Sequence, residues 1–261
     1  MHTLPLLVVT LAVAVSWCPL GAQEPDAWDP ADYELRIMTA KPGKLEALHN
    51  WFQAHREDVL AKNGAESIAY LVPAGGDPED KLVAILRFEN FPAKIRFLRA
   101  TGENALWNQV ADPDSSPDAL VAKVEHMSLQ RLVFSPKFEP TQQSEPRVFE
   151  LRTYTCPSEP MLARLHDRFR EHTMKLFEKH GMENLVYWRV RDIEDGERML
   201  VYLLGHKSVE AAQKSFAAFR SDPEWLEAKR DSEERAGGSL TIPDKGVLSA
   251  FLTPTDYSPL K

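Results

Sequence analysis

Alternating apolar and polar side chains mark the clearest strand of this chain. Residues 149–155 place two unlike sets on opposite faces, Phe149, Leu151 and Thr153 against Glu150, Arg152 and Tyr154. This period of two is typical of a β-strand. From Met161 to Lys179 apolar residues recur at steps of three and four, which predicts a helix with one apolar face that ends at Gly181.

The remaining pattern predicts the same order of elements twice. After the helix it indicates a hairpin, a second helix and a closing strand, at Leu185–Arg191, Arg198–His206, Val209–Phe219 and Gly246–Thr253. The first half repeats this order, with Tyr33–Thr39, Lys44–Lys62, Ile68–Val72, Leu82–Glu89, Pro92–Arg99 and Val121–Leu132. The order is that of the ferredoxin-like βαββαβ unit.

An internal repeat supports this division. Lys44–Tyr70 aligns without a gap to Met161–Tyr187, an offset of 117 residues (161 − 44), and nine positions coincide, among them Leu48/Leu165, His49/His166, His55/His172 and Gly64/Gly181. Ser135–Pro146 contains three prolines and is predicted to be a linker between halves at 32–138 and 146–261.

Two ferredoxin-like sheets in one chain can cover each other's open faces. We therefore predict an α+β fold in which the tandem units form an intrachain pseudo-dimeric α+β barrel. If Leu35 and Leu151 face the helices, one charged set faces the shared interior from each half: Glu34, Arg36 and Met38 from the first, and Glu150, Arg152 and Tyr154 from the second.

The N-terminus has the pattern of a secretory signal. Leu4–Trp17 is almost entirely apolar, too short for an ordinary membrane span, and small residues precede Gln23. We expect residues 1–22 to be removed on export to the periplasm or beyond, leaving no stable membrane span. The alternative is a segment retained as an anchor. Cleavage would remove Cys18 and leave Cys156 as a small packing residue.

Charge and missing motifs exclude several function classes. Lys and Arg number 31 against 39 Asp and Glu, a net charge of −8, which argues against nucleic acid as a partner. The sequence contains no phosphate-binding loop, HExxH motif, nucleophile elbow or paired cysteine motif. The better-marked hydrolases and nucleotide enzymes are thereby excluded, and no metal site is predicted.

The charged strand faces are the first candidate site. Glu150, Arg152 and Tyr154, with Glu34 and Arg36 from the other half, could bind an anion through the guanidinium groups. The alternative is a structural Glu–Arg network that joins the halves, since buried charges must be paired.

Histidines and aromatic residues form the second set of candidates. His166 and His172 invite a haem interpretation, but their spacing of six residues directs the two rings to different sides of one helix. The alternative is that His172 packs under the sheet and His166 lies at the edge of the apolar stripe. Tyr187 and Trp188 are either part of a ligand site or core residues.

Five segments of the second half resemble the NIPSNAP family: VFELRTYT (148–155), KHGM (179–182), LVYLLGHKS (200–208), FRSDPEW (219–225) and LTPTDYSPLK (252–261). The first half matches in pattern. The resemblance implies a dimeric α+β barrel and brings no accepted set of catalytic residues. Animal members are linked to mitochondria and to protein partners, but this N-terminus lacks the arginines of a transit peptide. An exported bacterial member fits better.

Two functions follow as hypotheses. The first is non-catalytic binding of a small molecule or a protein partner. The second, by analogy with related barrels, is a small-molecule monooxygenase or isomerase in which haem is the one cofactor to consider. Further association of the pseudo-dimer into homo-oligomers is left open.

Overall fold

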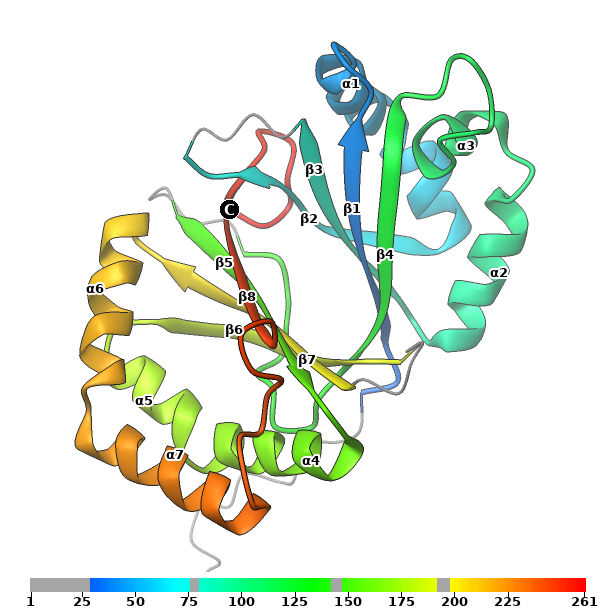
Figure 1. Cartoon of the computed structure of the whole chain (residues 1–261). Helices are drawn as coiled ribbons and strands as arrows, with labels where there is room; N and C mark the ends of the chain where they lie inside the picture. The colour runs from blue at the N-terminus through cyan, green and yellow to red at the C-terminus, as the bar shows by residue number, and fades with distance from the viewer. Residues whose placement is uncertain (1–28, 76–79, 142–146, 192–197) are drawn as a thin grey trace, which may run out of the picture.

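Eight strands of the described residues close into one barrel (Figure 1). The computed structural model describes residues 29–75, 80–141, 147–191 and 198–261. The strands are β1 Asp32–Ala40, β2 Ala65–Pro73, β3 Lys81–Phe88, β4 Val121–Arg131, β5 Val148–Cys156, β6 Glu183–Val190, β7 Arg198–His206 and β8 Val247–Pro254. The predicted signal segment 1–22 lies outside the described residues, and so do 142–146 of the predicted linker.

Each half of the barrel is a ferredoxin-like sheet. The strand order is β4-β1-β3-β2 in the first half and β8-β5-β7-β6 in the second, so the prediction of two tandem units in an α+β barrel is confirmed. Two short seams join the sheets: Leu71–Pro73 pairs with Leu252–Pro254, and Leu129–Arg131 pairs with Trp188–Val190. Backbone hydrogen bonds at these seams turn two facing sheets into a closed barrel.

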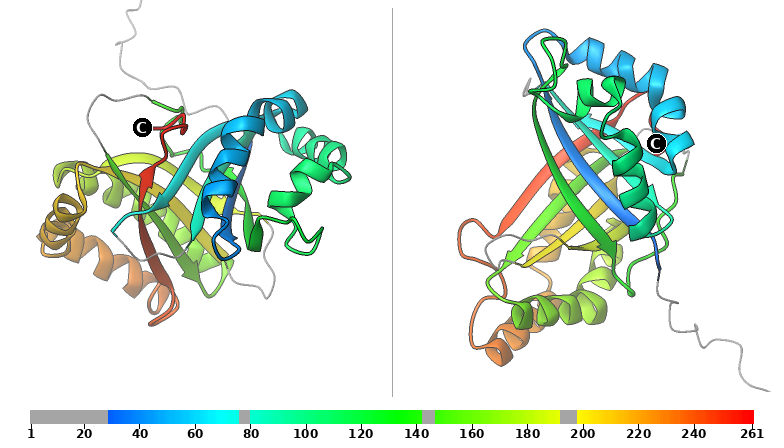
Figure 2. Two further views of the ribbon diagram at one scale, coloured as in Figure 1. Left: turned by 90° about the horizontal axis from the view of Figure 1, so that it is seen from above. Right: turned by 90° about the vertical axis from the view of Figure 1, so that its right-hand side faces the viewer.

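The helices lie outside the barrel, α1 to α3 beside the first sheet and α4 to α7 beside the second (Figures 1 and 2). Their bounds are α1 Leu45–His55, α2 Phe91–Thr101, α3 Ala105–Ala111, α4 Glu159–Arg168, α5 Met174–Lys179, α6 Val209–Arg220 and α7 Pro223–Ala236. The sequence pattern did not predict α3 or α7. No helix among the residues described is long and apolar enough to cross a bilayer.

Both long helices of the repeat contain a π-helical turn. In the first half η1 (Arg56–Leu60) follows α1, and a 3₁₀ turn, η2 (Ala61–Asn63), completes the helix. In the second half η3 (Phe169–Thr173) joins α4 to α5. A π-turn contains one residue more than an α-turn and rotates everything that follows it. As a result, Thr173 is buried where simple helical spacing predicts His172.

Apolar side chains from both sheets fill the barrel interior. Leu35 and Leu151 lie in this joint core together with Phe149 and Trp188. Two further cores lie between each sheet and its own helices. The core shared by the halves is therefore apolar, and the charged residues of β1 and β5 lie on the opposite face of their strands, toward the helix layers.

The segments that follow β4 and β8 cross to the opposite half at equivalent places. Backbone N–H groups of Tyr187 and Tyr70, which match each other in the repeat, donate to Ser135 Oγ at 2.8 Å and to Ser258 Oγ at 3.0 Å. Each serine stands in the same short motif, Phe134-Ser135-Pro136 after β4 and Tyr257-Ser258-Pro259 after β8. The halves thus exchange their C-terminal segments.

The first part of the predicted linker Ser135–Pro146 also packs against the barrel. Phe138 is buried in the joint core, with its ring centroid 5.6 Å from that of Trp188 and 6.5 Å from that of Tyr33. Prolines restrict the backbone in the same way whether a segment packs against the protein or lies in solvent, so they do not distinguish the two cases. The apolar ring at residue 138 decides that this part of the segment packs.

Candidate functional site

The charged faces of the first strands point toward the helices. Leu35 and Leu151 belong to the joint core, so alternation turns the opposite set outward from the barrel: Glu34, Arg36, Met38, Glu150, Arg152 and Tyr154. The guanidinium of Arg36 lies 4.7 Å from the ring of Trp107 on α3, and that of Arg152 lies 4.5 Å from the ring of Phe216 on α6. The prediction that these residues line the shared interior is therefore wrong.

The charged side chains point to the helix layers because a buried charge needs partners. A buried ion must be paired and hydrogen-bonded to be tolerated. The barrel interior holds apolar side chains from both sheets, whereas the helix layer of the first half supplies a lysine.

In the first half Lys94 of α2 holds two carboxylates of β1. Its Nζ lies 3.2 Å from Glu34 Oε2 and 3.3 Å from Asp32 Oδ1, and Arg36 pairs with Glu34. Burial raises the pKa of Glu34, but Arg36 and Lys94 outweigh it and hold that pKa below its usual range. Asp32 also pairs with Arg191 of the second half, Oδ2 to Nε 3.1 Å. This set is a structural network, and it does link the halves.

In the second half a histidine takes the place of the lysine. Glu150 accepts from Arg152 Nη1 at 2.6 Å and lies 3.1 Å from His206 Nε2. Arg152 Nη2 donates to Tyr154 Oη at 3.3 Å. Burial raises the pKa of Glu150, but the His206 hydrogen bond and the Arg152 charge outweigh it and keep the pKa below its usual range. Glu150 is therefore an anion with two partners, already satisfied.

The two predicted histidines do not come together. His172 is exposed, because η3 rotates it out of the apolar stripe, so its predicted packing role is wrong. His166 is half-buried, as predicted, with its ring 5.9 Å from that of Phe134. Burial lowers the pKa of His166 to about 4, so it is neutral at physiological pH.

The residues between α4 and the second sheet do not fit a haem. The ring of Phe169 lies 5.2 Å from that of Tyr202 and 5.6 Å from that of Tyr187, which fills the layer that a porphyrin would need. His172 is exposed and His166 Nε2 is enclosed. No group of three or more His, Cys, Asp or Glu side chains that could hold a metal ion occurs in the described part of the chain.

Tyr187 and Trp188 point to opposite sides of the sheet. Tyr187 stacks on Tyr202 in the helix layer, with centroids 5.2 Å apart and an interplanar angle of 21°. Trp188 lies inside the barrel. Cys156 is buried as predicted, and burial raises the pKa of its thiol to about 12. All three are packing residues.

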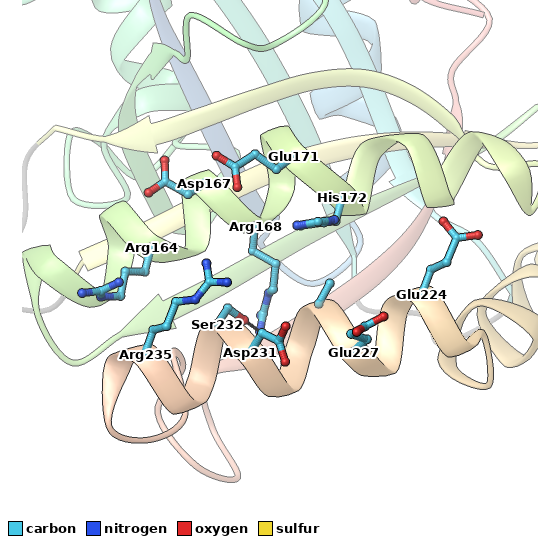
Figure 3. A pocket seen from close by; sticks show the side chains of 11 residues that line it. Arg164, Asp167, Arg168, Glu171, His172, Glu224, Glu227, Asp231, Ser232 and Arg235 are labelled. Atoms are coloured by element: carbon cyan, nitrogen blue, oxygen red, sulfur yellow. Dashed lines mark hydrogen bonds between the residues drawn. The ribbon is translucent and has the colours of Figure 1, made fainter.

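The structure adds a feature that the sequence pattern did not predict, a groove between α4 and α7. Its volume is about 480 Å³. It is lined by Arg164, Asp167, Arg168, Glu171 and His172 from α4 and η3, and by Glu224, Glu227, Ala228, Asp231, Ser232 and Arg235 from α7. Figure 3 shows the two helices as facing walls. We call this feature the α4–α7 groove. Of the predicted site residues, His172 alone lines it.

The sequence pattern did not predict helix α7 because few of its side chains are buried. Ala228 is its buried residue, so it lacks a clear apolar stripe. Its ends carry ordinary signals: Asp222 caps the N-terminus by accepting from Glu224 N at 2.9 Å, Pro223 follows, and Gly237 ends the helix with φ 77°. From these end signals the sequence could have predicted α7, the helix that forms one wall of the groove.

Three arginines gather at one end of the groove, which we call the arginine end. Arg164 and Arg168 lie one turn apart on α4, and Arg235 reaches from α7 to a place between them (Figure 3). Among the described residues neither Arg164 nor Arg235 has an ion-pair partner within 4.0 Å. These two guanidinium groups are therefore not engaged in ion pairs, in a groove that is lined by three arginines and five carboxylates.

Arg168 forms the floor of the arginine end. It is 6% exposed, and its guanidinium lies 5.1 Å from the ring of Trp225. Nη1 donates to Ser232 Oγ at 3.3 Å and lies 3.6 Å from Glu233 Oε1, while Nε has no hydrogen-bond partner. Burial lowers the pKa of Arg168 despite the charge of Glu233. This guanidinium is fixed in place but only weakly compensated.

The acidic side chains of the groove are engaged elsewhere. Cations outside the lining pair with them: Lys179 with Glu224 at 2.8 Å, Arg230 with Asp231 at 2.9 Å and with Glu227 at 3.8 Å, and Arg170 with Asp167 at 2.7 Å and Glu171 at 3.0 Å. They are therefore poor partners for Arg164 and Arg235.

Solved structures show the same barrel. An anthrone oxidase-like protein is 12% identical, with a TM-score of 0.57, over 89% of this chain and 95% of that chain. A candidate monooxygenase from Lactobacillus acidophilus NCFM is 10% identical, with a TM-score of 0.52, over 86% and 93%. A NIPSNAP family protein of unknown function from Agrobacterium tumefaciens matches 46% of this chain and 98% of its own, with 16% identity and a TM-score of 0.37. At these identities the first two likenesses show the fold alone.

The family comes from the sequence match. No protein of the curated set is similar to this chain. The NIPSNAP family model matches residues 33–136 and again residues 149–259, one match for each half of the barrel. The chain therefore belongs to the NIPSNAP family, of which it contains two units in tandem.

Proposed function

We propose that this protein is a non-catalytic binding protein and that the α4–α7 groove holds a small anionic molecule. One observation carries the proposal: Arg164 and Arg235 lie at the arginine end of the groove with no ion-pair partner among the described residues. A volume of about 480 Å³ is within the range of small-molecule sites.

Electrostatics supports an anion over a neutral ligand. Arg164 and Arg235 have no ion-pair partner within 4.0 Å among the described residues, so a bound anion would supply one. Arg168 adds a third guanidinium that burial has already stripped of most water, which strengthens any charged hydrogen bond it makes. Arginine forks suit carboxylate and phosphate oxygens.

Native mass spectrometry of the protein purified from its natural host tests the proposal. We expect a retained small molecule that disappears in the double variant Arg164→Gln/Arg235→Gln. Both residues are exposed, so the variant should keep its melting temperature. The matched control is Arg99→Gln, which removes the same charge from an exposed arginine of α2, in the other half of the chain. Equal retention by wild type and double variant, with no anion raising the melting temperature of either, would reject the groove as a binding site.

A catalytic role is the second candidate, proposed for the buried set of Glu150, Arg152 and Tyr154. The observation that favours it is the chain of contacts from Glu150 through Arg152 to the Tyr154 hydroxyl, which could orient an oxygen-bearing substrate for a monooxygenase or isomerase. Aerobic turnover of phenolic substrates, lost in Tyr154→Phe, is the result this candidate requires.

Export to the periplasm or beyond is part of the proposal. The apolar run Leu4–Trp17 followed by small residues supports it. Sequencing the N-terminus of the exported protein should give Gln23. Recovery of Met1 from that compartment would reject cleavage and leave the retained anchor.

A further inference from the structure

We infer that one edge of strand β8 joins this protein to a second copy of itself, in an antiparallel pair of strands centred on Leu248. We call residues 247–250, on the side of β8 that faces away from β5, the β8 edge. The inference goes beyond the proposed function, because the α4–α7 groove takes no part in it. It is carried by the strand pairing, by the exposed side chains and by a contrast with the equivalent edge in the other half.

Strand β8 is paired on one side along most of its length and on the other side only at its end (Figure 1). β5 pairs with six of its residues and β2 with three. On the β2 side, Phe251 O also accepts from Ala74 N at 2.8 Å. Backbone groups of a strand alternate between its two sides, so those of Val247 and Ser249 point the same way as those of Phe251. Within the described ranges they have no backbone partner on that side.

The side chains of the β8 edge are exposed and uncharged. Val247 is 43% exposed and Leu248 is 63% exposed, the highest value among the large apolar side chains that the structure describes. Ser249 and Ala250 are exposed as well. An exposed strand edge with apolar side chains is a template for pairing with another chain.

Strand β4 has the equivalent place in the first half, and its edge is protected by charge. Its seam with β6 likewise involves only three residues. The two Ser-Pro motifs give an offset of 123 (258 − 135), which matches Leu248 with Glu125 and Ser249 with His126. Glu125 pairs with the exposed Lys123 at 2.9 Å. Charged side chains on a strand edge discourage edge-to-edge pairing, and the β8 edge lacks them.

A second copy is the partner that the β8 edge itself specifies. The edge has no charged side chain that would select a partner of opposite charge. It continues the seam in which β2 already pairs with the same side of β8, so an added strand extends an existing ladder. Two identical edges placed antiparallel complement each other about a two-fold axis.

Ala74 restricts the register of this pair. Because it already donates to Phe251 O, Val247 and Ser249 are the residues left to form hydrogen-bonded pairs. Val247 pairs with Ser249 of the second copy and Ser249 with Val247 of the second copy, which gives about four backbone hydrogen bonds. Leu248 then faces its own copy on the two-fold axis, with the two Cα atoms about 4.5 Å apart.

Sedimentation velocity of the full chain from about 5 to about 500 µM tests the inference. The edge is short, so we expect a reversible dimer with a dissociation constant on the order of 10–100 µM. Leu248→Glu gives β8 the residue that β4 carries and places two carboxylates opposite each other, so it should weaken dimerisation at least about tenfold. Leu226→Glu, at a leucine of α7 that is 53% exposed, is the matched control and should leave the dimer unchanged.

A mixture of two charge variants tests whether the edge pairs with itself. Leu248→Glu and Leu248→Lys should each be monomeric at concentrations where the wild type is dimeric. Mixed in equal amounts they should form a dimer again, because residue 248 of one copy faces residue 248 of the other and opposite charges across a strand pair attract. Both variants should keep the wild-type melting temperature, since Leu248 is exposed.

Cysteine cross-linking tests the register. In a Cys18→Ser background, Leu248→Cys should form an intermolecular disulfide on mild oxidation, because the Cα separation on the axis lies within the range of roughly 4.4–6.8 Å that a disulfide needs. Ser249→Cys faces Val247 of the second copy and is the control, which should cross-link much more slowly. Cys156 is buried and does not compete.

Three outcomes would overturn the inference. The first is a wild type that stays monomeric over the whole concentration range, with no cross-link in Leu248→Cys. The second is a dimer that Leu248→Glu does not weaken, which would place the contact on another surface. The third is a dimer that is lost in Leu248→Glu and not recovered in the mixture, which would mean that the edge contacts a different surface of the second copy.

Discussion

The two halves carry different side chains at the same position of the same helix. Trp51 in the first half matches Arg168 in the second, at the repeat offset of 117 (168 − 51). Each faces the tryptophan of its own half. The ring centroids of Trp51 and Trp107 lie 6.2 Å apart, and the Arg168 guanidinium lies 5.1 Å from the ring centroid of Trp225. An indole at this place belongs to the apolar core of the first half, whereas a guanidinium forms the floor of the α4–α7 groove.

The facing helix differs in the same direction. In the first half α3 has 7 residues, and in the second α7 has 14. Arg164 is matched by Ala47. The comparison teaches that one βαββαβ unit can have either an apolar layer or a charged groove beside its first helix, depending on a few side chains and the length of one helix. The sheet alone does not decide where a ligand binds.

The largest expected effect comes from separating the halves. Residues 146–261 expressed alone should dimerise or aggregate, because their Tyr257–Leu260 tail has lost the half it packs on and the joint core is open. Sedimentation velocity checks this. A stable, monodisperse monomer would show that the exchanged segments and the joint core are dispensable.

Trp51 and Arg168 should respond in opposite ways. Trp51→Ala removes a buried indole and should lower the free energy of unfolding by about 3–5 kcal/mol in urea denaturation. Arg168→Met replaces a weakly paired buried cation by an apolar chain of similar length and should change stability by no more than about 1 kcal/mol, while weakening anion binding. A large loss of stability in Arg168→Met would make that residue structural.

The buried Glu–Arg pairs should also differ between halves. Arg152→Met leaves Glu150 with His206, which is a cation only when protonated, and should cost about 3 kcal/mol of unfolding free energy. Arg36→Met leaves Glu34 with Lys94 at 3.2 Å and should cost about half as much. The control is the double variant Glu150→Leu/Arg152→Met, which removes both charges and should recover much of the loss. Equal costs for the two arginine variants would mean that the lysine gives no compensation.

The smallest expected effect is a pH dependence set by His166. Burial lowers its pKa from 6.5 to about 4, so the neutral form stabilises the fold fully above pH 6.5, and that stability is lost as the pH falls from 6.5 toward 4. His166→Phe should remove about 2 kcal/mol of this change, measured as unfolding free energy against pH relative to wild type. His49→Phe, in which the matching ring contacts the Tyr257 hydroxyl at 2.8 Å, is the comparison. If the unfolding free energy of both variants depends on pH as that of the wild type does, neither histidine governs acid unfolding.

The repeat, the βαββαβ order and the barrel could be predicted from the sequence because they depend on local periods. A period of two in residues 149–155 and steps of three and four from Met161 specify strand and helix wherever they lie. The gap-free repeat of 27 residues then required that both halves share one fold. Burial of Cys156 was expected from its apolar chemistry, whereas the sequence left Tyr187 and Trp188 open between a ligand site and the core, and the structure placed both in the core.

The face of each strand could not be predicted in this way. Alternation separates Leu151 from Arg152 but does not say which of the two points to the helices, because both layers are buried. Tertiary structure decided it: Lys94 and the ring of Phe216 lie in the helix layers, and the barrel interior offers no partner for a charge among the residues of its core. In the same way η3, and not the count of residues, turned His172 to the surface.

The candidate site was hidden for a related reason. By itself the sequence determined which residues carry charge, that Arg164 and Arg168 share a helix face, and that the chain folds as two units of one kind. Only the tertiary structure placed Arg235 opposite them, because that depends on the packing of α7 against α4, between residues 71 positions apart in the chain (235 − 164). A ligand site made by two helices is a property of their contact, and no local period encodes that contact.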